Sequence, residues 1–409
     1  MNRNTPLAIA IVAAGVNTTF ADTYRVPDDF PSIQTAIDGA ADGDLIMIAP
    51  GEWSESIDTL GKSITIQGDG TASEVVLRSP DGDSVLFLDL PGVVTTFRDL
   101  TFTGGVADTT IRIDDASPTF ERCIFRDNLR GAVSDYGSCG QTSGVTIVDS
   151  LFIDNQNVNA AGIYLSNSNS VLEGCTFIDN VAVGQGSPFV SAGAAVYVNN
   201  WDCGINSFAI RDCDFSGNSA VWGGGLYAQG VFPSAATDLI VDGCRFIDNS
   251  ANEGRAMWLW YIDSDVSNTY FCGGGDQIHN GWGDQGGNTF VDDCGGAELD
   301  DCDGDRISDA LAISLGLATD CNADGRPDVC TAGDPKIDAD GNGIPDACES
   351  APCPGDVTGN GIVDAADLGI LLAVWETAGK NNPLADVNGD GTVDASDLGL
   401  LLGAWGLCP

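Results

Sequence analysis

Basic residues and histidine are scarce in this sequence. Of its 409 residues, 60 are acidic and only 16 are basic, which gives a formal net charge of −44. A chain of this charge is repelled by phosphate groups, so we expect neither a nucleic-acid partner nor attachment to an anionic membrane surface. The single histidine, His279, excludes mechanisms that need two, such as catalysis by a zinc ion held by three histidines.

Long apolar runs are also scarce. Residues 6–16 form one, after the start MNRN and before Thr19-Phe20-Ala21. A weakly basic start, an apolar core of about ten residues and a small residue at the cleavage point are typical of a secretory signal peptide, so we predict that residues 1–21 are removed. The alternative, an N-terminal membrane anchor, needs a longer apolar run. No later run approaches a membrane span, and we therefore expect an extracellular or cell-surface protein without a transmembrane segment.

Fourteen cysteines are present, yet none forms a CxxC pair and no histidine lies beside two of them, so a zinc site is not indicated. Their number fits the oxidising environment of an exported protein. Two groups stand out, one in a repeated segment and one in the acidic tail. The first comprises Cys123, Cys175, Cys213 and Cys244, and the second comprises Cys302, Cys321, Cys330, Cys348, Cys353 and Cys408.

A repeat fills the segment between positions 100 and 250. The motif F-x-x-N occurs as FRDN, FIDN, FIDN, FSGN and FIDN after a looser first copy, LTFTGG, with the phenylalanines Phe102, Phe125, Phe152, Phe177, Phe215 and Phe246. Each copy has an alternating apolar stretch before the phenylalanine and usually a second apolar stretch after the asparagine, such as AAGIYL or AGAAVYV. Alternation indicates strands with one buried face, and unequal spacing indicates a constant core with variable loops. The pattern predicts a mainly β solenoid of parallel strands.

These units resemble the right-handed parallel β-helix, or pectin-lyase-like, family, and also the repeats of bacterial polymorphic outer-membrane adhesins. Residues 32–40 fit a short helix with Ser32 as its N-cap, and in this family such a helix closes the first coil. The resemblance implies a β-helix over residues 22–296. It is specific for the fold and says little about activity.

Equivalent residues of stacked coils form columns, because neighbouring strands lie about 4.8 Å apart. We expect the phenylalanines to form an inward column. Cysteines two positions earlier share that face, and form either a buried column of small residues or disulfides between coils, such as Cys213 with Cys244. The asparagines are expected to form a hydrogen-bonded ladder at a turn: Asn128, Asn155, Asn180, Asn218 and Asn249. The preceding acidic residues form either a solvated turn or a cation-binding stripe: Asp127, Asp154, Asp179 and Asp248.

Catalytic residues are not evident in the repeat. Polysaccharide-cleaving members of the resembled family use clustered aspartates with histidine or arginine in fixed motifs. The only histidine here lies in DQIHNGWG without a following basic pair, and no arginine lies in a matching motif. The segment MWLWYID places Trp258 and Trp260 on one strand face, where they form either a sugar-stacking platform or a cap on the core.

From Asp300 the sequence changes to aspartate, asparagine and glycine at alternate positions. Oxygen ligands at positions 1, 3 and 5, with a glycine in the turn, suit a calcium ion. Three such units resemble thrombospondin type-3 calcium repeats, which we place at residues 297–350; a helix around residues 310–317 is an alternative for the end of the first. We expect disulfides to join the units, in pairs such as Cys302–Cys321 and Cys330–Cys348, whereas the alternative for the whole segment is a flexible acidic spacer. The candidate ligands are Asp301, Asp303, Asp305 and Asp309; Asp320, Asn322, Asp324 and Asp328; and Asp338, Asp340, Asn342 and Asp346.

The last residues contain a duplication. DVTGNGIVDAADLGILLAVW begins at Asp356, and DVNGDGTVDASDLGLLLGAW begins 30 residues later at Asp386. Each copy fits a calcium loop, with a glycine at its sixth position where a positive φ is required, followed by a helix. The first loop offers Asp356, Thr358, Asn360, Asp364 and Asp367 with the carbonyl of Ile362, and the second offers Asp386, Asn388, Asp390, Asp394 and Asp397 with the carbonyl of Thr392.

This pair resembles a type I dockerin, a calcium-folded module that binds a cohesin, and we assign it to residues 351–409. The resemblance implies Ca²⁺ as the cofactor and a cohesin-like or surface-anchoring partner. Thr358 and Asn360 depart from the usual Asn and Asp, so we expect a weaker first site. Cys353 and Cys408 bracket the module, as in a dockerin subtype used for anchoring. A paired EF-hand with purely structural calcium is the alternative.

Two functions fit these segments. The first is a secreted, calcium-binding β-helix protein without catalysis, which presents a glycan-binding or adhesin-like surface and is secured through its dockerin. The second is a polysaccharide-degrading enzyme, either a pectate-lyase-like lyase or a glycoside hydrolase, because a β-helix joined to a dockerin often belongs to carbohydrate breakdown. The missing catalytic motifs favour the first, with a polysaccharide as the expected ligand.

Overall fold

The computed structural model divides the chain into two compact units, residues 1–318 and residues 319–409. It describes residues 21–138, 143–184, 191–200, 206–230, 237–294, 300–331, 334, 336–338, 345, 348, 355–358, 362–377 and 384–407. The predicted signal peptide lies outside these ranges apart from Ala21. None of the helices within them combines the length and the apolar character that a membrane crossing requires.

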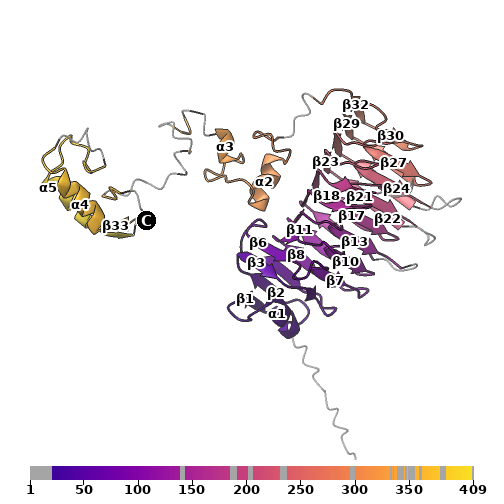
Figure 1. Ribbon diagram of the computed structural model, residues 1–409, viewed down its shortest axis with the longest axis horizontal. Coiled ribbons are helices and arrows are strands. Elements are labelled where there is room, and N and C mark those ends of the chain that lie inside the picture. Colours follow the sequence, from indigo (N-terminus) through magenta and orange to yellow (C-terminus); the bar gives the residue numbers. More distant parts are fainter. Residues whose placement is uncertain are drawn as a thin grey trace, which may run out of the picture. The chain divides into compact units, whose positions relative to one another are not determined.

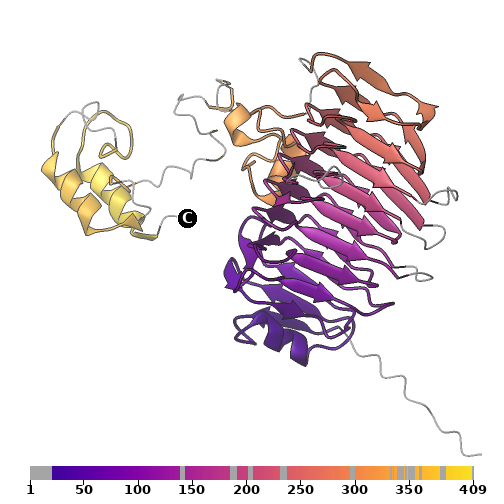
Figure 2. The same cartoon turned by 45° about the vertical axis from the view of Figure 1, so that its right-hand side comes forward.

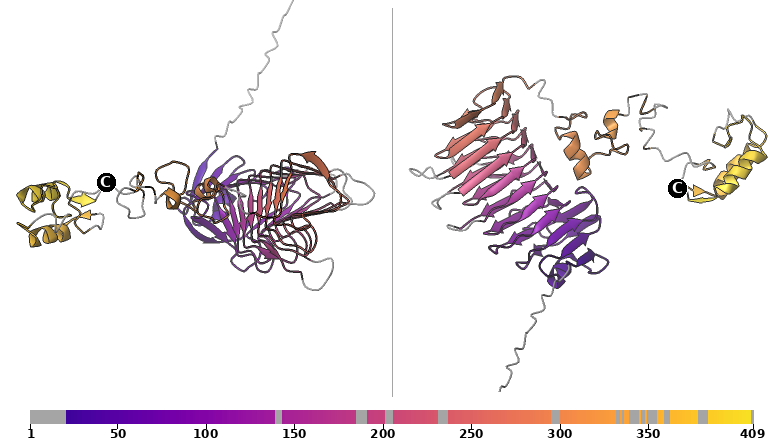
Figure 3. Two further views of the ribbon diagram at one scale, coloured as in Figure 1. Left: turned by 90° about the horizontal axis from the view of Figure 1, so that it is seen from above. Right: turned by 180° about the vertical axis from the view of Figure 1, so that it is seen from behind.

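The first unit is a right-handed solenoid of three parallel sheets, visible along its length in Figures 1 and 2 and from two further sides in Figure 3. This is the mainly β fold that the repeats predict. The first sheet contains β1 (Thr23–Val26), β2 (Leu45–Ile48), β5 (Thr65–Gly68), β8 (Thr96–Arg98), β11 (Thr119–Glu121), β14 (Thr146–Val148), β18 (Ser170–Glu173), β22 (Asn206–Arg211), β25 (Thr237–Asp242), β28 (Asp263–Ser267) and β31 (Gly283–Gly286).

The other two sheets complete each coil. The second sheet contains β3 (Gly51–Ser54), β6 (Val75–Arg78), β9 (Thr101–Thr103), β12 (Ile124–Arg126), β15 (Leu151–Ile153), β19 (Thr176–Ile178), β23 (Asp214–Ser216), β26 (Arg245–Ile247), β29 (Tyr270–Cys272) and β32 (Thr289–Val291). The third sheet contains β4 (Ile57–Asp58), β7 (Leu86–Leu88), β10 (Ile111–Asp114), β13 (Val133–Tyr136), β17 (Ile163–Ser166), β21 (Val196–Asn199), β24 (Leu226–Gln229), β27 (Met257–Trp260) and β30 (Ile278–His279). A short parallel pair joins β16 (Gln156–Asn157) and β20 (Val181–Ala182).

The predicted N-terminal helix is α1 (Ile33–Gly39), and Ser32 is its N-cap. The Ser32 hydroxyl accepts a hydrogen bond from the Thr35 amide, and the Thr35 hydroxyl accepts one from the Ser32 amide, which forms a capping box. The apolar face of the helix is fully buried in the core of the solenoid. The helix therefore covers the first coil.

The core contains the predicted phenylalanine column. Its rings stack face to face along the second sheet, with neighbouring centroids 4.3–5.4 Å apart. The column runs from Phe102 to Phe246 and then continues through Phe271 to Phe290. Phe290 lies on the last strand of the sheet and is 49% exposed, whereas the other rings are fully buried.

The predicted asparagine ladder lies at the turn between the second and third sheets. Each asparagine side chain bonds to the next one, as when Nδ2 of Asn155 donates to Oδ1 of Asn180 at 2.9 Å. Each amide also donates to a backbone carbonyl, such as that of Phe152, 3.0 Å from Nδ2 of Asn180. All five asparagines are buried, so the ladder is part of the core.

The residue before each ladder asparagine has a left-handed backbone. The φ angle is 57° at Asp127, 55° at Asp154, 51° at Asp179, 68° at Gly217 and 49° at Asp248. Aspartate adopts this conformation more readily than most side chains, and glycine adopts it without a steric penalty. The turn geometry therefore explains both the aspartate series and the glycine that interrupts it.

The cysteine column is buried and contains free thiols. Cys123, Cys175, Cys213 and Cys244 are fully buried, and none of them forms a disulfide. Burial raises the pKa of the Cys123 and Cys213 thiols well above the ordinary range. The column is thus the predicted row of small core residues, and the alternative of inter-coil disulfides is wrong.

Residues 300–318, which we call the strap, belong to the first unit, although the sequence pattern groups them with the calcium repeats. Helix α2 (Asp309–Leu315), which the sequence allowed after the first acidic unit, forms the middle of the strap. Its side chains bury apolar residues of the second sheet that face outward, on β12, β15 and β19. Beside this contact the Arg306 guanidinium pairs with the Asp179 carboxylate. The strap is therefore held to the β-helix by both apolar and ionic contacts.

One carboxyl group is buried in the solenoid. Asp135 on β13 has no exposed surface, and its register neighbours are Ile113 and Leu165. Its Oδ2 accepts hydrogen bonds from the Ser170 hydroxyl at 3.0 Å and the Val145 amide at 3.3 Å, whereas Oδ1 has no partner. Burial raises the pKa of Asp135 from 3.8 to about 6, despite these hydrogen bonds.

We expect Asp135→Asn to stabilise the protein at pH 8 by about 3 kcal/mol and to have a much smaller effect at pH 4. The folded wild type holds this proton up to about pH 6, whereas the unfolded chain releases it near pH 3.8. Stability therefore falls as the pH rises between these values, and the asparagine variant lacks this loss. Guanidinium unfolding at both pH values measures the difference, with Asp263→Asn, an exposed position on β28, as the control. Equal slopes with pH in wild type and Asp135→Asn would contradict the prediction.

The second unit contains α3 (Asp328–Thr331), α4 (Ala365–Ala373) and α5 (Ala395–Gly403), and a short antiparallel pair of β33 (Ile362–Val363) with β34 (Gly406–Leu407). Its core is small. Leu371 and Leu401 lie in it, whereas Leu372 and Leu402 of the same helical stripes are exposed. Among the residues of this unit that the structure describes, the fully buried apolar side chains are those of Val363, Leu371, Ala385, Val393 and Leu401.

Candidate metal-binding loops and docking module

The loop that begins at Asp386 is organised by hydrogen bonds from its own backbone. The Asp386 carboxylate accepts from the amides of Asp390 (3.1 Å) and Gly391 (2.9 Å). The Asn388 side-chain oxygen accepts from Asp390, and the Asp390 carboxylate accepts from Thr392. These bonds fold the loop backbone around the side chains at positions 1, 3 and 5. Gly391, at position 6, has a φ of 94°, as the calcium-loop pattern requires.

Asp397 closes this loop from the helix that follows it. Its carboxylate is fully buried and accepts from the amides of Asn388 (3.0 Å) and Asp394 (2.7 Å). Asp394 is the N-cap of α5, and its own carboxylate accepts from the Ser396 amide. Helix capping and loop closure therefore use the same residues, which places position 12 next to position 3.

The first copy repeats this closure through Asp367. Its carboxylate accepts from the amides of Thr358 and Asp364, each at 2.8 Å, and from the Thr358 hydroxyl. Burial alone would raise the pKa of Asp367, but these hydrogen bonds hold it below its ordinary value. The same Thr358 hydroxyl lies 3.3 Å from the Asp356 carboxylate, so its one proton is shared between the two carboxylates and threonine at position 3 is engaged within the loop. Asn360 lies outside the described residues, and the direction of the Ile362 carbonyl remains an expectation.

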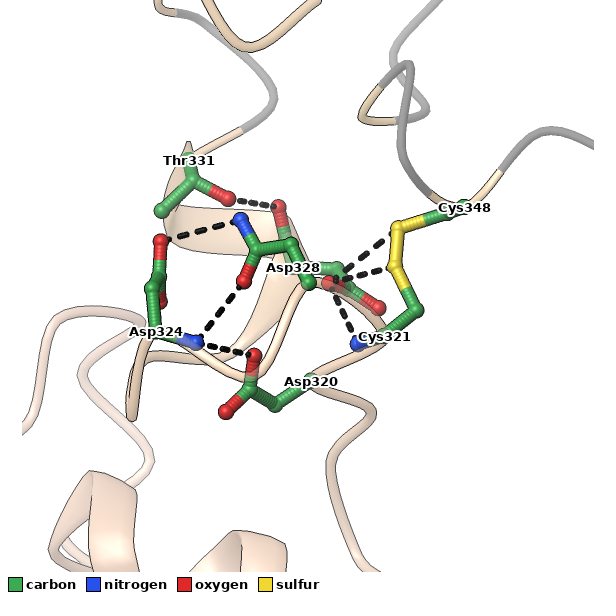
Figure 4. The surroundings of a disulfide bond; sticks show 7 residues. Asp320, Cys321, Asp324, Asp328, Thr331 and Cys348 are labelled. Carbon is green, nitrogen blue, oxygen red and sulfur yellow. Dashed lines mark hydrogen bonds between the residues drawn. A yellow bond between two sulfur atoms is a disulfide. The ribbon is translucent and has the colours of Figure 1, made fainter.

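The second tail unit has the same hydrogen-bond arrangement (Figure 4). The Asp320 carboxylate accepts from the amides of Asp324 (3.1 Å) and Gly325 (2.9 Å), and the Asn322 side-chain oxygen accepts from Asp324 (3.0 Å). The Asp328 carboxylate accepts from the Cys321 amide at 3.1 Å. Positions 1, 3 and 5 are thus held as in the loop at Asp386, although this unit belongs to a different motif.

The first tail unit lies in the strap and follows the same plan. Its Asp301, Asp303 and Asp305 offer oxygen atoms within 4.8 Å of one another. Backbone amides of the loop donate to Asp301, including that of Arg306 at 2.9 Å. Asp309 is 2% exposed, and its Oδ2 has no hydrogen-bond partner in the described structure. The arrangement concentrates carboxylate oxygens without a cationic side chain among them, which suits a hard cation.

The third tail unit is described only at Asp338, which is buried. Asp340, Asn342 and Asp346 lie outside the described residues. The predicted disulfides Cys302–Cys321 and Cys330–Cys348 are wrong, because Cys321 is bonded to Cys348 (Figure 4). Cys321 faces Asp328, the residue that closes its loop, and Cys348 lies against the same carboxylate. A further disulfide, Cys272–Cys294, joins the last described turns of the β-helix.

A cavity of ≈400 Å³ separates part of the strap from the second sheet. Asp127, Asp154 and Asp305 line it together with Arg126. Burial, together with the nearby carboxylates of Asp179 and Asp127, raises the pKa of Asp154. Arg126 pairs with the neighbouring Asp127 at 3.1 Å. The cavity therefore gathers three carboxylates beside an arginine that is paired with one of them.

The aromatic segment of β27 lies on the outer face of the third sheet. Met257 and Leu259 point into the core, so Trp258 and Trp260 point outward and the interpretation as a core cap is wrong. Trp258 stacks on Tyr227 with centroids 4.6 Å apart, and His279 stacks on its other side at 6.1 Å. This stacking covers the faces of the Trp258 ring, so a sugar platform on β27 is limited to Trp260.

Comparison with known protein families identifies the family to which the first unit belongs. Residues 71–281, just over half of the chain, match the family described as the right-handed beta helix region. The chain belongs to the right-handed β-helix family. In this β-helix protein, residues 354–402 match the dockerin type I domain, so the duplicated loop–helix units form a dockerin. No curated protein sequence matches the chain.

The β-helix protein is also similar to solved structures of the same fold. A pectin methylesterase from carrot is 13% identical with a TM-score of 0.45, over 72% of this chain and 93% of that one. A pectate lyase is 14% identical with a TM-score of 0.43, over 74% and 86%. An alginate lyase from Paenibacillus sp. is 14% identical with a TM-score of 0.34, over 66% and 98%. These likenesses concern the fold and leave activity open.

Proposed function

We propose that this protein works outside the cell as a non-catalytic β-helix component, which presents its solenoid to polysaccharide and is held in place by its dockerin. The observation that carries the proposal is the duplicated surface of the dockerin. Leu372 on α4 and Leu402 on α5 occupy matched positions, and they are 51% and 52% exposed. Exposed leucines at equivalent places of two helices suit a cohesin-like or surface-anchoring partner, because apolar side chains of this size gain free energy when a partner covers them.

We propose Ca²⁺ as the ion of the two dockerin loops and of the tail units. Support comes from the hydrogen bonds that two different motifs share, in which backbone amides of the loop donate to the side-chain oxygens of positions 1, 3 and 5. Closely spaced carboxylates repel one another unless a cation neutralises them. Calcium accepts a flexible cage of about six to eight oxygen ligands, which suits a loop of this kind. Asp367 and Asp397, at position 12 of their loops, would each bind the ion of that loop.

A binding measurement tests the dockerin proposal. Full-length protein in calcium is passed over immobilised cohesin modules. We expect binding that the double variant Leu372→Asp/Leu402→Asp weakens about 100-fold or more, because two leucines that the partner would cover become charged. Leu384→Asp is the matched control, since this leucine lies in the same unit outside the helices and is 64% exposed. No binding to any cohesin, or equal loss with Leu384→Asp, would contradict the proposal.

A polysaccharide-degrading enzyme is the second candidate. The cavity beneath the strap favours it, because Asp127, Asp154 and Asp305 gather there and hydrolysis of a glycosidic bond uses paired carboxylates. Incubation with pectins, alginates and neutral glycans separates the two candidates. Retention on a glycan without cleavage supports the non-catalytic protein. New reducing ends, or the ultraviolet absorbance of unsaturated products, would support the enzyme instead.

A further inference from the structure

The last described coil of the β-helix contains a hollow that lies apart from the metal-binding loops and the strap. We call it the cup and define it by Asp276, Gln277, Ile278, Trp282, Phe290 and Asp292. Its volume is ≈320 Å³, which is within the range of small-ligand sites. The cup lies at β30 and β32, the final strands of the third and second sheets.

Two aromatic rings form its apolar walls. Trp282 and Phe290 have centroids 6.2 Å apart and planes inclined by 52°, so they do not cover each other's faces. Phe290 stacks on Phe271 by one face, at 4.6 Å. Because β32 is the last strand of its sheet, no further ring of the column covers the other face of Phe290 among the described residues. The cup thus presents an open aromatic face beside a second ring.

Hydrogen-bond acceptors surround these rings. Asp276 accepts from the Gly254 amide through Oδ2, and the same oxygen lies 2.8 Å from Nδ1 of His279, so its other oxygen is left for a ligand. The Asp292 carboxylate has no hydrogen-bond partner among the described residues. Gln277 is fixed by the bond from its amide to the Gly274 carbonyl at 2.6 Å, which makes it a rigid part of the wall.

The charge of this region restricts the ligand. The cup holds two carboxylates and no lysine or arginine among its lining residues. The Arg255 guanidinium lies behind the wall, where it donates to the carbonyls of Gly273 and Gly274. Residues 297–409 contain 22 acidic and 4 basic residues, which leaves −26 of the total charge of −44 on residues 1–296. An anionic sugar such as a uronate would therefore meet repulsion both locally and from the surrounding surface.

We infer that the cup binds one sugar ring of a polysaccharide that carries no negative charge. A pyranose has an apolar face of C–H groups that packs on an aromatic ring, and hydroxyl groups at its rim that donate to carboxylates. The cup offers both features in one hollow of suitable size. This inference rests on the proposed role in presenting the solenoid to polysaccharide, and it names the place and the chemical class of the contact.

Titration calorimetry of the full-length protein in calcium tests the cup with three probes. These are neutral β-linked hexose oligosaccharides, an N-deacetylated amino-sugar oligosaccharide and an oligogalacturonate. We expect the neutral probe or the amino-sugar probe to bind and the oligogalacturonate not to bind. Trp282→Ala and Asp292→Asn should each weaken binding about tenfold or more. Asp292 is exposed, so its variant tests the cup without disturbing the fold.

Trp260→Ala is the matched control, because Trp260 is exposed outside the cup on β27. If Trp260→Ala abolishes binding and the cup variants leave it intact, the inference about the cup is wrong. The proposed function would still stand in that case. Preferential binding of oligogalacturonate would overturn the inference as well. Failure of every glycan to bind would remove both the cup and the polysaccharide role, whereas the cohesin measurement would still report on the dockerin.

Discussion

Chelation of calcium with EGTA is expected to abolish the helical circular-dichroism signal of the second unit while the strand signal of the β-helix persists. Among its described residues, the second unit has five fully buried apolar side chains in its core. A core this small rarely stabilises a fold alone, and metal binding commonly supplies the missing free energy. The β-helix, in contrast, is stabilised by stacked strands and a continuous apolar core, neither of which involves a metal ion.

A thermal melt of the full-length protein measures this effect. With calcium we expect two transitions, and with EGTA the transition of the second unit should vanish while that of the β-helix shifts by a few degrees at most. Asp397→Ala should reproduce the loss in the dockerin even with calcium present, because this residue closes its loop. Glu376→Gln removes an exposed carboxylate of the same unit outside the loops and should leave both transitions in place. A single transition that chelation shifts as a whole would refute the modular account.

The strap makes this expectation sharper than the sequence alone allows. Residues 300–318 are anchored by apolar contacts of α2 and by the pair of Arg306 with Asp179, and neither contact uses a carboxylate of the loop at Asp301. After chelation, limited proteolysis should therefore begin beyond Ala318. The sequence pattern, in contrast, assigns residues 297–350 to one calcium-binding segment. It therefore predicts that the first cuts after chelation lie near position 300. Early cleavage at position 300 would show that the acidic loop, not the helix, holds the strap.

Sequence reasoning succeeded where one periodic rule governs many positions. The F-x-x-N units fixed the phenylalanine column and the asparagine ladder, because each coil must place equivalent residues in line with its neighbours. The dockerin loops were recognisable for a similar reason, since the spacing of oxygen ligands is set by the turn of the loop. Local geometry of this kind depends on a few consecutive residues, so the sequence contains all the information it needs.

Contacts between distant segments were missed because they follow no local period. The outward apolar residues Ile124, Leu151 and Ile178 occur in three successive coils, where a solvated sheet face would be polar. These outward apolar residues indicated that another segment packs on this face of the sheet. Nothing in the sequence pattern identified α2 as that segment. The predicted disulfide pairs were wrong for a similar reason. They joined cysteines that follow one another in the sequence, whereas the bond at the loop of Asp320 joins Cys321 to Cys348.

Asn180→Ala should destabilise the β-helix by about 4 kcal/mol. Asn180 occupies the middle of the ladder and is fully buried. Its Oδ1 accepts from both the backbone amide (3.3 Å) and the side-chain amide (2.9 Å) of Asn155, and its Nδ2 donates to the carbonyl of Phe152 (3.0 Å) and to Asn218 (2.9 Å). Alanine removes these four bonds, and two buried donors of Asn155 lose their acceptor.

A buried polar group without a partner costs about 1–3 kcal/mol, because it leaves water without forming a new bond. Two such groups and the small cavity together account for the expected loss. Guanidinium unfolding of the full-length protein, followed by the strand signal in calcium, gives the change in free energy. Asn252→Ala is the control, since this asparagine lies exposed near the same turn two coils later and should change stability by less than about 0.5 kcal/mol. A loss below about 1 kcal/mol for Asn180→Ala would mean that the ladder follows from the stacking of the strands and does not support it.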